Sequence, residues 1–267
     1  MNRRQVQLDL LLPALGDIPL RDQRETMERP FFSLSKKKRL TPIEYVSPNG
    51  EVFVNVLPHQ KFGMATIWDA DVLIWAASVL SALKRKGANH IPRTLEFMPY
   101  DLLRTIGRDG GGNDYKHLRD ALARLRSTEI LTNIRVSEGT QHRHFSWIES
   151  WSDLTKGDSS RGMSLTLSDW FYEGVLMDGG VLSIDPTYFQ ISGGRERWLY
   201  RVARKHAGEG GFTIPLPTLF LKAGCEGTYR RFKFEMARIA AANALPGFDI
   251  ALELSKSEPW LHLQRTG

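Results

Sequence analysis

Residues 115–125, YKHLRDALARL, and residues 229–239, YRRFKFEMARI, decide the fold of this chain. They align at a constant offset of 114 residues, and matched positions agree in character: an aromatic residue, then two basic or imidazole residues, then apolar residues at helical spacing. A repeat of this kind predicts two copies of one domain. The basic residues on the outward side of each copy point to nucleic acid as the partner.

The sequence before each repeat matches as well. Residues 101–107 and 218–224 align at an offset of 117, and both predict a short helix that begins at an N-cap residue and ends at glycine. Further upstream, residues 69–86 and 186–207 each predict a long core helix. Five basic side chains are expected on the outer surface of the second core helix: Arg195, Arg197, Arg201, Arg204 and Lys205.

A β-hairpin is predicted after each repeat. Its strands span residues 129–136 and 142–151 in the first copy, and residues 248–254 and 260–265 in the second. A short β-type stretch also precedes each short helix. Helix, strand, helix, turn, helix and hairpin together form a winged helix, a variant of the helix-turn-helix. The predicted fold class is therefore α+β, with two winged-helix domains in tandem.

The chain then divides into three parts. Residues 1–30 show no sustained helical or strand period, and they predict a mobile arm or a partner-docking segment. Residues 31–155 are the predicted N-terminal winged-helix domain, which opens with a small hairpin, and residues 163–267 are the C-terminal one. The polar, glycine-rich residues 155–162 are expected to be the linker between the domains, with a loop inside one domain as the alternative.

The composition fits a soluble protein that binds an anionic partner. Hydrophobic residues make up 42% of the 267 residues, enough to bury a core in each half. The net charge of +6 favours a phosphate-rich partner, although ordinary solubility also accounts for a charge of this size. A single cysteine, Cys225, excludes an internal disulfide, and no apolar stretch reaches about 18 residues. We therefore expect a cytoplasmic protein without membrane contact.

The outward faces of the two repeats hold the predicted DNA contacts. The apolar residues of each repeat share one helix face, and the cations lie opposite, toward the end where recognition helices meet bases. A solvated charged face is the alternative, but such faces usually mix both signs, and acids are scarce here. The predicted DNA-binding residues are Asn113, Lys116, His117, Arg119, Arg124, Thr228, Arg230, Arg231, Lys233, Phe234 and Arg238, together with Arg143 near the tip of the first hairpin and Lys37 and Lys38.

Two of these assignments need further comment. Lys37 and Lys38 belong to the basic run at residues 36–39, which either contacts a phosphate backbone or solvates the edge of a sheet. The outer face of the second repeat carries Phe234 where the first carries Asp120. We therefore expect the second copy to make the tighter and more specific contact, and the first to make a weaker contact or a self-association surface.

The sequence offers little for catalysis. Residues 107–112 are glycine-rich but are not followed by the lysine and hydroxyl residue of a phosphate-binding loop. His142 and His144 share one face of a strand, but no third metal ligand is evident near them, so a hairpin tip is the favoured interpretation. Tyr188 and Tyr200 lack the histidine metal cluster that a strand-nicking tyrosine needs. We expect no enzyme activity, no cofactor and no metal.

Two segments resemble a known family. Residues 30–36, PFFSLSK, and residues 63–76, GMATIWDADVLIWA, are similar to the plasmid replication initiator protein A family of alphaproteobacteria. The resemblance implies a plasmid-encoded initiator with tandem winged helices, which binds repeated duplex DNA sites at its own origin and helps to open adjacent AT-rich DNA. It also implies recruitment of host replication proteins, among them a host initiator and a helicase. Relatives change between a repressing dimer and an initiating monomer, which implies a homodimer and control of plasmid copy number.

Two other functions fit the same predicted domains. A transcriptional regulator would use the winged helices on an operator and have no role in replication. A scaffold would use them for protein contacts, which the basic faces disfavour. Regularly spaced direct repeats beside the gene would indicate an origin, whereas a single palindrome would indicate an operator.

Overall fold

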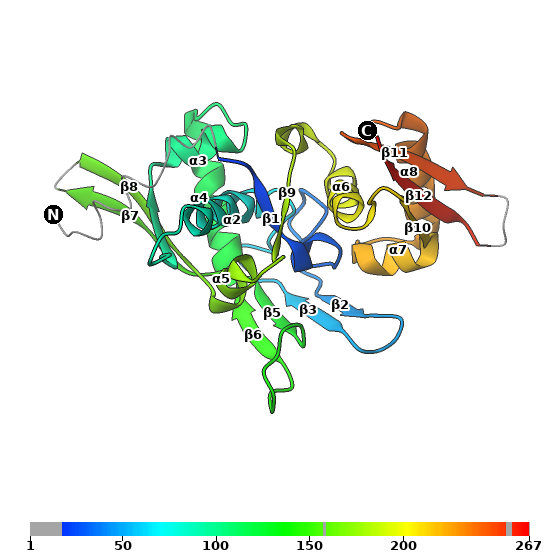
Figure 1. The fold of residues 1–267 in the computed structure, drawn as a ribbon, viewed down its shortest axis with the longest axis horizontal. Coiled ribbons are helices and arrows are strands. Elements are labelled where there is room, and N and C mark those ends of the chain that lie inside the picture. The colour runs from blue at the N-terminus through cyan, green and yellow to red at the C-terminus, as the bar shows by residue number, and fades with distance from the viewer. Residues whose placement is uncertain (1–17, 157–158, 255–257, 267) are drawn as a thin grey trace.

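The computed structural model describes residues 18–156, 159–254 and 258–266. Two groups of helices and strands follow one another along the long axis of the molecule (Figure 1). We call them the first unit, residues 70–167, and the second unit, residues 194–265. The first described residues of the chain, drawn in blue, lie between the two units.

The first unit combines helices with an antiparallel sheet in the strand order β4-β8-β7. Its first helix, α2, is buried along almost its whole length, as expected of the predicted core helix. The elements of this unit are α2 (Ala70–Arg85), β4 (Thr94–Phe97), α3 (Pro99–Thr105), α4 (Gly112–Ser127), β7 (Ile148–Lys156) and β8 (Ser159–Leu167).

The second unit repeats this plan. Its antiparallel sheet has the strand order β10-β12-β11, so the strand that follows the first helix pairs with the last strand in both units. The elements are α6 (Gly194–His206), β10 (Phe212–Pro215), α7 (Leu216–Ala223), α8 (Tyr229–Ala242), β11 (Phe248–Glu253) and β12 (Trp260–Arg265). The order of elements and the order of strands are thus the same in the two units, as the sequence repeat predicts.

The two short helices begin earlier than predicted. Each starts two residues before the residue expected to be its N-cap, and each has a proline, Pro99 or Pro217, in its first turn. Proline is favoured there because its missing N–H would have no partner inside the helix.

The hairpin that follows α4 belongs to a different sheet. Strands β5 (Glu129–Thr132) and β6 (Arg143–Ser146) extend the pair β2 (Ile43–Val46) and β3 (Phe53–Leu57) in the order β2-β3-β5-β6. The prediction that the hairpin of residues 129–151 completes the first unit is therefore wrong for β5 and β6, and only residues 148–151, at the start of β7, lie in the sheet of that unit. Ile130 and Thr132 are buried on alternate positions opposite the buried Val54 and Val56 of β3, and this shared apolar face fixes the pairing.

The strands that complete the first unit include the predicted linker. Residues 155–162 hold the end of β7 and the beginning of β8, which pair with each other and, through β8, with β4. The linker prediction at these residues is thus wrong, apart from residues 157–158, which lie outside the described residues. Alternation of small and apolar residues after Gly162 continues the strand, with Met163, Leu165 and Leu167 buried.

The residues between the units carry α5 (Asp169–Leu176), β9 (Val181–Ser183) and a 3₁₀ helix, η3 (Pro186–Gln190). The core helix predicted at residues 186–207 is therefore interrupted, and α6 begins only at Gly194. A second 3₁₀ helix, η2 (Arg24–Met27), follows β1 (Arg21–Gln23), which pairs with β9 in antiparallel register.

The N-terminal arm is the largest correction to the predicted organisation. Residues 18–30 belong to the segment predicted to be a mobile arm or a partner-docking segment, but they include β1 and η2, and Gln23 and Met27 within them are fully buried against the rest of the chain. Residues 1–17 lie outside the described residues. The buried apolar side chains of both units and of residues 18–34 join in one continuous cluster, so the two units share a core.

Candidate nucleic-acid interface

Helix α4 presents one polar face, as its periodicity predicts. Leu118 and Leu122 are buried in the core. The Asp114 carboxylate accepts hydrogen bonds from the N–H groups of Gly110 (3.1 Å) and Gly111 (3.3 Å), and these bonds fix the start of the helix. Four of the predicted DNA-binding residues are exposed on this helix: Asn113, Lys116, His117 and Arg119.

Arg124, predicted to contact DNA, is instead part of the packing of the first unit. Its guanidinium makes two hydrogen bonds of 2.8 Å to the carboxylate of Asp69, just before α2. The hydrogen bonds to Asp69 raise the pKa of Arg124. Arg124 is thus held by Asp69 at the edge of the cleft described below, and its remaining N–H donors, rather than the whole guanidinium, are left for a DNA contact. Arg119 is exposed but paired, with its Nη2 atom 2.9 Å from Asp153 of β7.

Helix α8 has the more open basic face. Phe232, Met236 and Ile239 are buried on its inner side. Thr228, also predicted to contact DNA, is the N-cap, and its hydroxyl accepts the N–H of Arg231 at 3.3 Å. The exposed residues on the outer side are Arg230, Arg231, Phe234 and Arg238, and Lys233 is half-buried.

Two of the outer arginines on α8 have carboxylate partners. Arg231 lies 3.0 Å from Glu235 on the same helix, and Arg238 lies 3.4 Å from Glu196 of α6. Glu235 also pairs with Arg195 at 2.7 Å. Exposed pairs of this kind contribute little to stability, so both arginines can exchange their partner for a phosphate.

Several of the predicted cations have no ion pair within the described residues: Lys37, Lys38, Lys116, His117, Arg230 and Lys233. Arg230 is exposed at the start of α8, one helical turn before Phe234. A cation without an internal partner keeps all of its donors for a ligand. Arg230 is therefore the best placed arginine for an external contact on α8.

The basic run at residues 36–39 divides into two parts. Arg39 is buried, and it donates hydrogen bonds to the carbonyl oxygens of Thr41 (2.9 Å), Pro42 (3.1 Å) and Gly224 (2.6 Å). It thus attaches this segment to the end of α7. The three lysines before it are exposed and line a hollow between the units.

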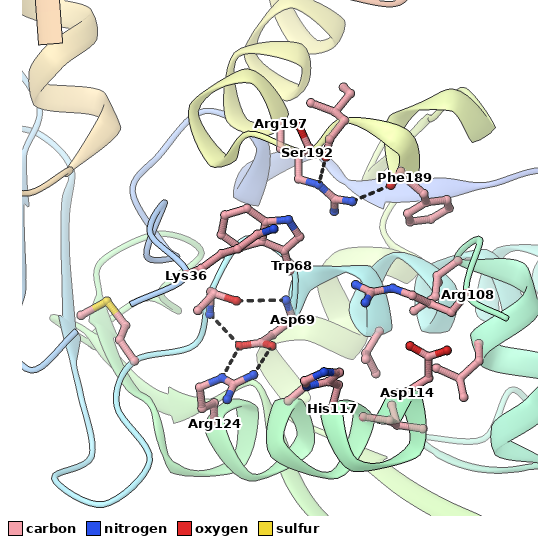
Figure 2. A pocket seen from close by; sticks show the side chains of 18 of the residues that line it. Lys36, Trp68, Asp69, Arg108, Asp114, His117, Arg124, Phe189, Ser192 and Arg197 are labelled. Carbon is pink, nitrogen blue, oxygen red and sulfur yellow. Dashed lines mark hydrogen bonds and ion pairs between the residues drawn. The ribbon is translucent and has the colours of Figure 1, made fainter. Parts of the chain in front are cut away.

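This hollow, which we call the inter-unit cleft, has a volume of about 600 Å³ and lies between α4 and the connection from η3 to α6. Figure 2 shows Lys36 across the ring of Trp68 on one side of the cleft, with Arg108 and His117 on the other sides. Its charged lining consists of Lys36, Lys37, Lys38, Arg108, Arg124 and Arg197, against Asp69 and Asp114. The excess of cations makes the cleft attractive to anions.

A second hollow has a volume of about 470 Å³ and shares Gln190, Ile191 and Ser192 with the lining of the cleft. Its lining includes Arg238 of α8, whereas Asp114, His117 and Arg124 of α4 line the cleft. The contributions of Arg108 and Trp68 to the cleft were not predicted, because the sequence does not indicate that the loops carrying them meet the basic run at residues 36–39.

Arg143 is the first residue of β6 and lies near the tip of the β5–β6 hairpin, as predicted, but this hairpin is in the sheet that includes β2 and β3. Its Nη2 atom is 3.4 Å from Glu173 of α5. The hairpin equivalent to β11 and β12 is formed by β7 and β8, so Arg143 is not on the corresponding hairpin of the first unit.

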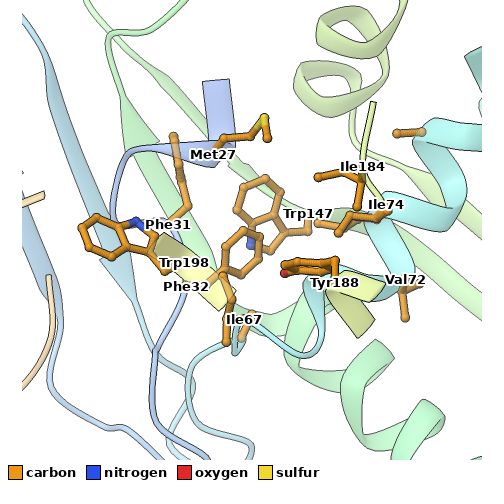
Figure 3. Packing of buried hydrophobic residues seen from close by; sticks show 14 of the residues in the cluster. Met27, Phe31, Phe32, Ile67, Val72, Ile74, Trp147, Ile184, Tyr188 and Trp198 are labelled. Carbon is orange, nitrogen blue, oxygen red and sulfur yellow. The ribbon is translucent and has the colours of Figure 1, made fainter. Parts of the chain in front are cut away.

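Two arginines of α6, Arg197 and Arg201, are buried and bind segments outside the second unit, so they do not lie on the outer surface as predicted. Arg201 is 1% exposed, and it bonds to both Asp22 oxygens (2.6 and 3.1 Å). Its guanidinium also lies over the ring of Phe32, 5.5 Å from the centroid. Figure 3 shows Phe31 and Phe32 between Trp147 of the first unit and Trp198 of α6. We call this set of contacts across the units the seam.

Two further ionic groups complete the seam. Arg197 makes bonds of 2.7 and 2.9 Å to the fully buried carboxylate of Asp71 in α2. Burial raises the pKa of Asp71 to about 6, although the charge of Arg197 opposes this change. A single acid inside the apolar helix 70–83 is the sequence signal for such a pair, since a buried charge needs a counter-charge.

Glu28 is the centre of the second group. Its carboxylate accepts 2.8 Å bonds from Lys205 and His206 of α6 and from Lys222 of α7. Burial acts to raise the pKa of Glu28, but the bond from His206 and the charges of the two lysines outweigh it and hold this pKa well below its usual range. Residue 28 lies in the segment that was predicted to be mobile.

The groups considered for catalysis lie in different surroundings. Tyr188 is fully buried, and burial raises its pKa above the usual range. His144 lies 3.3 Å from Glu129 on the neighbouring strand. Across the described residues no cluster of three histidine, cysteine or acidic side chains is arranged to hold a metal. Every helix within the same residues is too short or too polar to cross a membrane.

The fold is similar to two solved structures. A crystal structure of domains 2 and 3 of RctB matches with a TM-score of 0.60, at 13% sequence identity over 90% of this chain and 95% of that one. A second structure of the same domains matches with a TM-score of 0.54, at 14% identity over 91% and 96% of the two chains. At this level of identity, the likeness concerns the fold.

Sequence comparison gives the family. The family model "Replication initiator protein A" matches residues 21–250. A protein of Wigglesworthia glossinidia brevipalpis, described as "Putative replication protein", is 34% identical over 242 residues, which are 88% of this chain and 86% of that protein. The family resemblance drawn from residues 30–36 and 63–76 is thus confirmed. This chain belongs to the replication initiator protein A family.

Proposed function

We propose that this protein initiates replication by binding repeated duplex DNA sites at its origin through two winged helices. In each unit the element order is helix, strand, helix, helix and hairpin, and the first strand pairs with the last. This is the plan of a winged helix, with α4 and α8 as recognition helices. On this proposal β7–β8 and β11–β12 are the wings.

The open basic face of α8 is the observation that carries the proposal. Arg230 is exposed, has no ion pair within the described residues, and lies near the N-terminus of the helix, where recognition helices meet base edges. An arginine in this position makes a bidentate contact to guanine or holds a phosphate. The corresponding face of α4 offers Lys116 and His117.

The inter-unit cleft gives the DNA backbone a path between the two helices. Its lysines and Arg108 line the cleft together with residues of α4, and Arg238 of α8 lines the second hollow. Cations along such a path release counterions from DNA, so binding is expected to weaken steeply with salt. The protein acts by binding, without cofactor or catalytic step. We further propose, on the family resemblance, that the protein opens a plasmid origin, recruits a host initiator and a helicase, and forms a homodimer that limits copy number.

The first test compares two arginine variants of equal charge. Arg230→Gln is expected to weaken binding to the direct repeats beside the gene by about tenfold or more, since a good base contact is worth about 1–3 kcal/mol. Arg85→Gln, at the exposed end of α2, removes the same charge away from both recognition helices and is expected to leave the affinity unchanged. Fluorescence anisotropy on labelled duplexes measures both. Equal affinity of Arg230→Gln and wild type would contradict the role of α8.

A replication assay separates an initiator from a transcriptional regulator. A plasmid without its own replicon, carrying this gene and its flanking DNA, is expected to replicate in a permissive host. Arg230→Gln is expected to abolish replication if α8 binds the origin. If the plasmid with the wild-type gene fails to replicate, although the protein binds a single palindrome tightly, the result favours the transcriptional regulator.

A further inference from the structure

Phe234 is the most exposed large hydrophobic side chain in the described part of the chain. It is 72% exposed, at the middle of the outer side of α8. Arg230 and Arg238 lie one helical turn before and after it, so all three side chains are neighbours on one face. An exposed aromatic ring at the centre of a basic helix face offers an apolar contact to a partner that the neighbouring cations attract.

The packing of α8 leaves Phe234 no internal role. The buried side of the helix is formed by Phe232, Met236 and Ile239. Phe232 and Tyr229 make their ring contacts with Phe220 of α7, whereas no aromatic or cation–π contact involves Phe234 within the described residues. Phe234 points away from this cluster, and the second unit is complete without it.

The surroundings of Phe234 restrict the chemistry of the partner. Arginines and Lys233 surround the ring, and the nearby acids Glu196 and Glu235 are already paired. A partner on this face must therefore be anionic and must offer one small apolar group at the position of the ring. In duplex DNA the C5 methyl of thymine is the apolar group that base edges present in the major groove.

We infer that Phe234 selects thymine, by packing against its C5 methyl group when α8 lies in the major groove. This inference rests on the proposed function and adds to it a base identity for one position of the site. Covering one methyl group is worth about 0.8 kcal/mol, which corresponds to a factor of about four in Kd. Arg230 and Arg238 hold the helix on either side of that position.

The test removes the methyl group from the DNA and the ring from the protein. Each thymine of the binding site, selected from random duplexes with the wild-type protein, is replaced in turn by deoxyuridine, which pairs identically but lacks the methyl group. Wild type is expected to lose about fourfold in affinity at one or two positions. Phe234→Ala is expected to bind thymine and deoxyuridine equally at those positions, and with the affinity that wild type shows for deoxyuridine.

Two controls make the result specific. Phe234→Leu keeps an apolar side chain and is expected to retain part of the discrimination. Leu221→Ala removes an exposed apolar side chain from α7 and is expected to retain all of it. Because Phe234 is exposed and alanine is a good helix former, the fold of Phe234→Ala is expected to be unchanged by circular dichroism.

Two outcomes overturn the inference while leaving the proposed function intact. One is a scan in which no deoxyuridine replacement lowers the affinity of the wild-type protein, although this protein binds the unmodified site tightly. The other is an equal loss at the same thymine for wild type and Phe234→Ala. If wild type selects no duplex at all, the proposed function itself fails, and the inference fails with it.

Discussion

Asp71 illustrates at residue scale how much of this molecule depends on buried charge. Its carboxylate has no exposed surface, and two bonds from Arg197 satisfy it, with Arg108 3.8 Å away. Removing one partner of such a pair leaves the other charge buried without compensation, which costs about 3–5 kcal/mol.

Asp71→Asn is therefore expected to lower the free energy of unfolding by about 3 kcal/mol at pH 7. Asp153→Asn, which breaks the exposed pair with Arg119, is expected to have a much smaller effect. Urea denaturation followed by circular dichroism measures both variants. A loss for Asp71→Asn no larger than that for Asp153→Asn would show that the pair with Arg197 contributes little.

At the scale of elements, the two hairpins after α4 have different surroundings. Strands β5 and β6 are part of the sheet with β2 and β3, whereas β7 and β8 share a sheet with β4. Only the second pair has a counterpart in the second unit. The insertion of β5 and β6 between α4 and β7 therefore adds a sheet to the first unit without changing its plan.

The charged end of the β5–β6 hairpin is expected to be dispensable for DNA binding. The double variant His142→Gln/Arg143→Gln should bind the origin repeats within about a factor of two of wild type, because Arg143 already pairs with Glu173 and the hairpin is not equivalent to β11–β12. Anisotropy under the conditions used for Arg230→Gln tests this. A tenfold loss would place this hairpin on the DNA.

The helices were predictable because their information is local. The period of 3.6 residues placed Leu118 and Leu122 of α4, and Phe232 and Met236 of α8, on buried faces, whereas Thr228 was predicted to contact DNA and is the N-cap of α8. Strand pairing was not predictable in the same way. Residues 129–132 alternate as a strand should, but alternation does not tell which sheet the strand joins.

For the charged residues of the candidate site, too, the local feature was predictable and the long-range partner was not. Arg230 and Phe234 were predicted to be outward, and they are exposed. Arg124 and Arg201 were predicted to be outward too, and they pair with Asp69 and Asp22. The helical period tells on which side of its own helix a side chain lies. It does not tell whether a distant segment covers that side and supplies a carboxylate to pair with the side chain.

At the scale of the whole molecule, the seam joins the two units through the N-terminal segment. Glu28 contributes to it through hydrogen bonds with two lysines and His206 of α6 and α7. Its pKa is lower in the folded protein than in the unfolded chain, whose ordinary value is 4.5. The stability due to this carboxylate is therefore complete above about pH 4.5 and decreases as the pH falls below that value.

Glu28→Gln is expected to lower the free energy of unfolding by about 3 kcal/mol at pH 6, since it leaves buried cations without their counter-charge. The difference from wild type should shrink as the pH falls below about 4.5, because wild type then loses the same interaction. Urea titrations at pH 6 and at lower pH measure this. A difference that does not change with pH would argue against the titration of Glu28.

The pairing of β1 with β9 has a consequence for the synthesis of the protein. Arg21 pairs with Ser183, so the first strand leaves the ribosome long before its partner exists. At about 5–20 residues per second, translation of the intervening chain takes roughly 8–30 s. During that time Phe31 and Phe32 have no second unit to bury them, and a chaperone that holds apolar segments would find them accessible. The halves of this protein can close on each other only after most of the chain has been made.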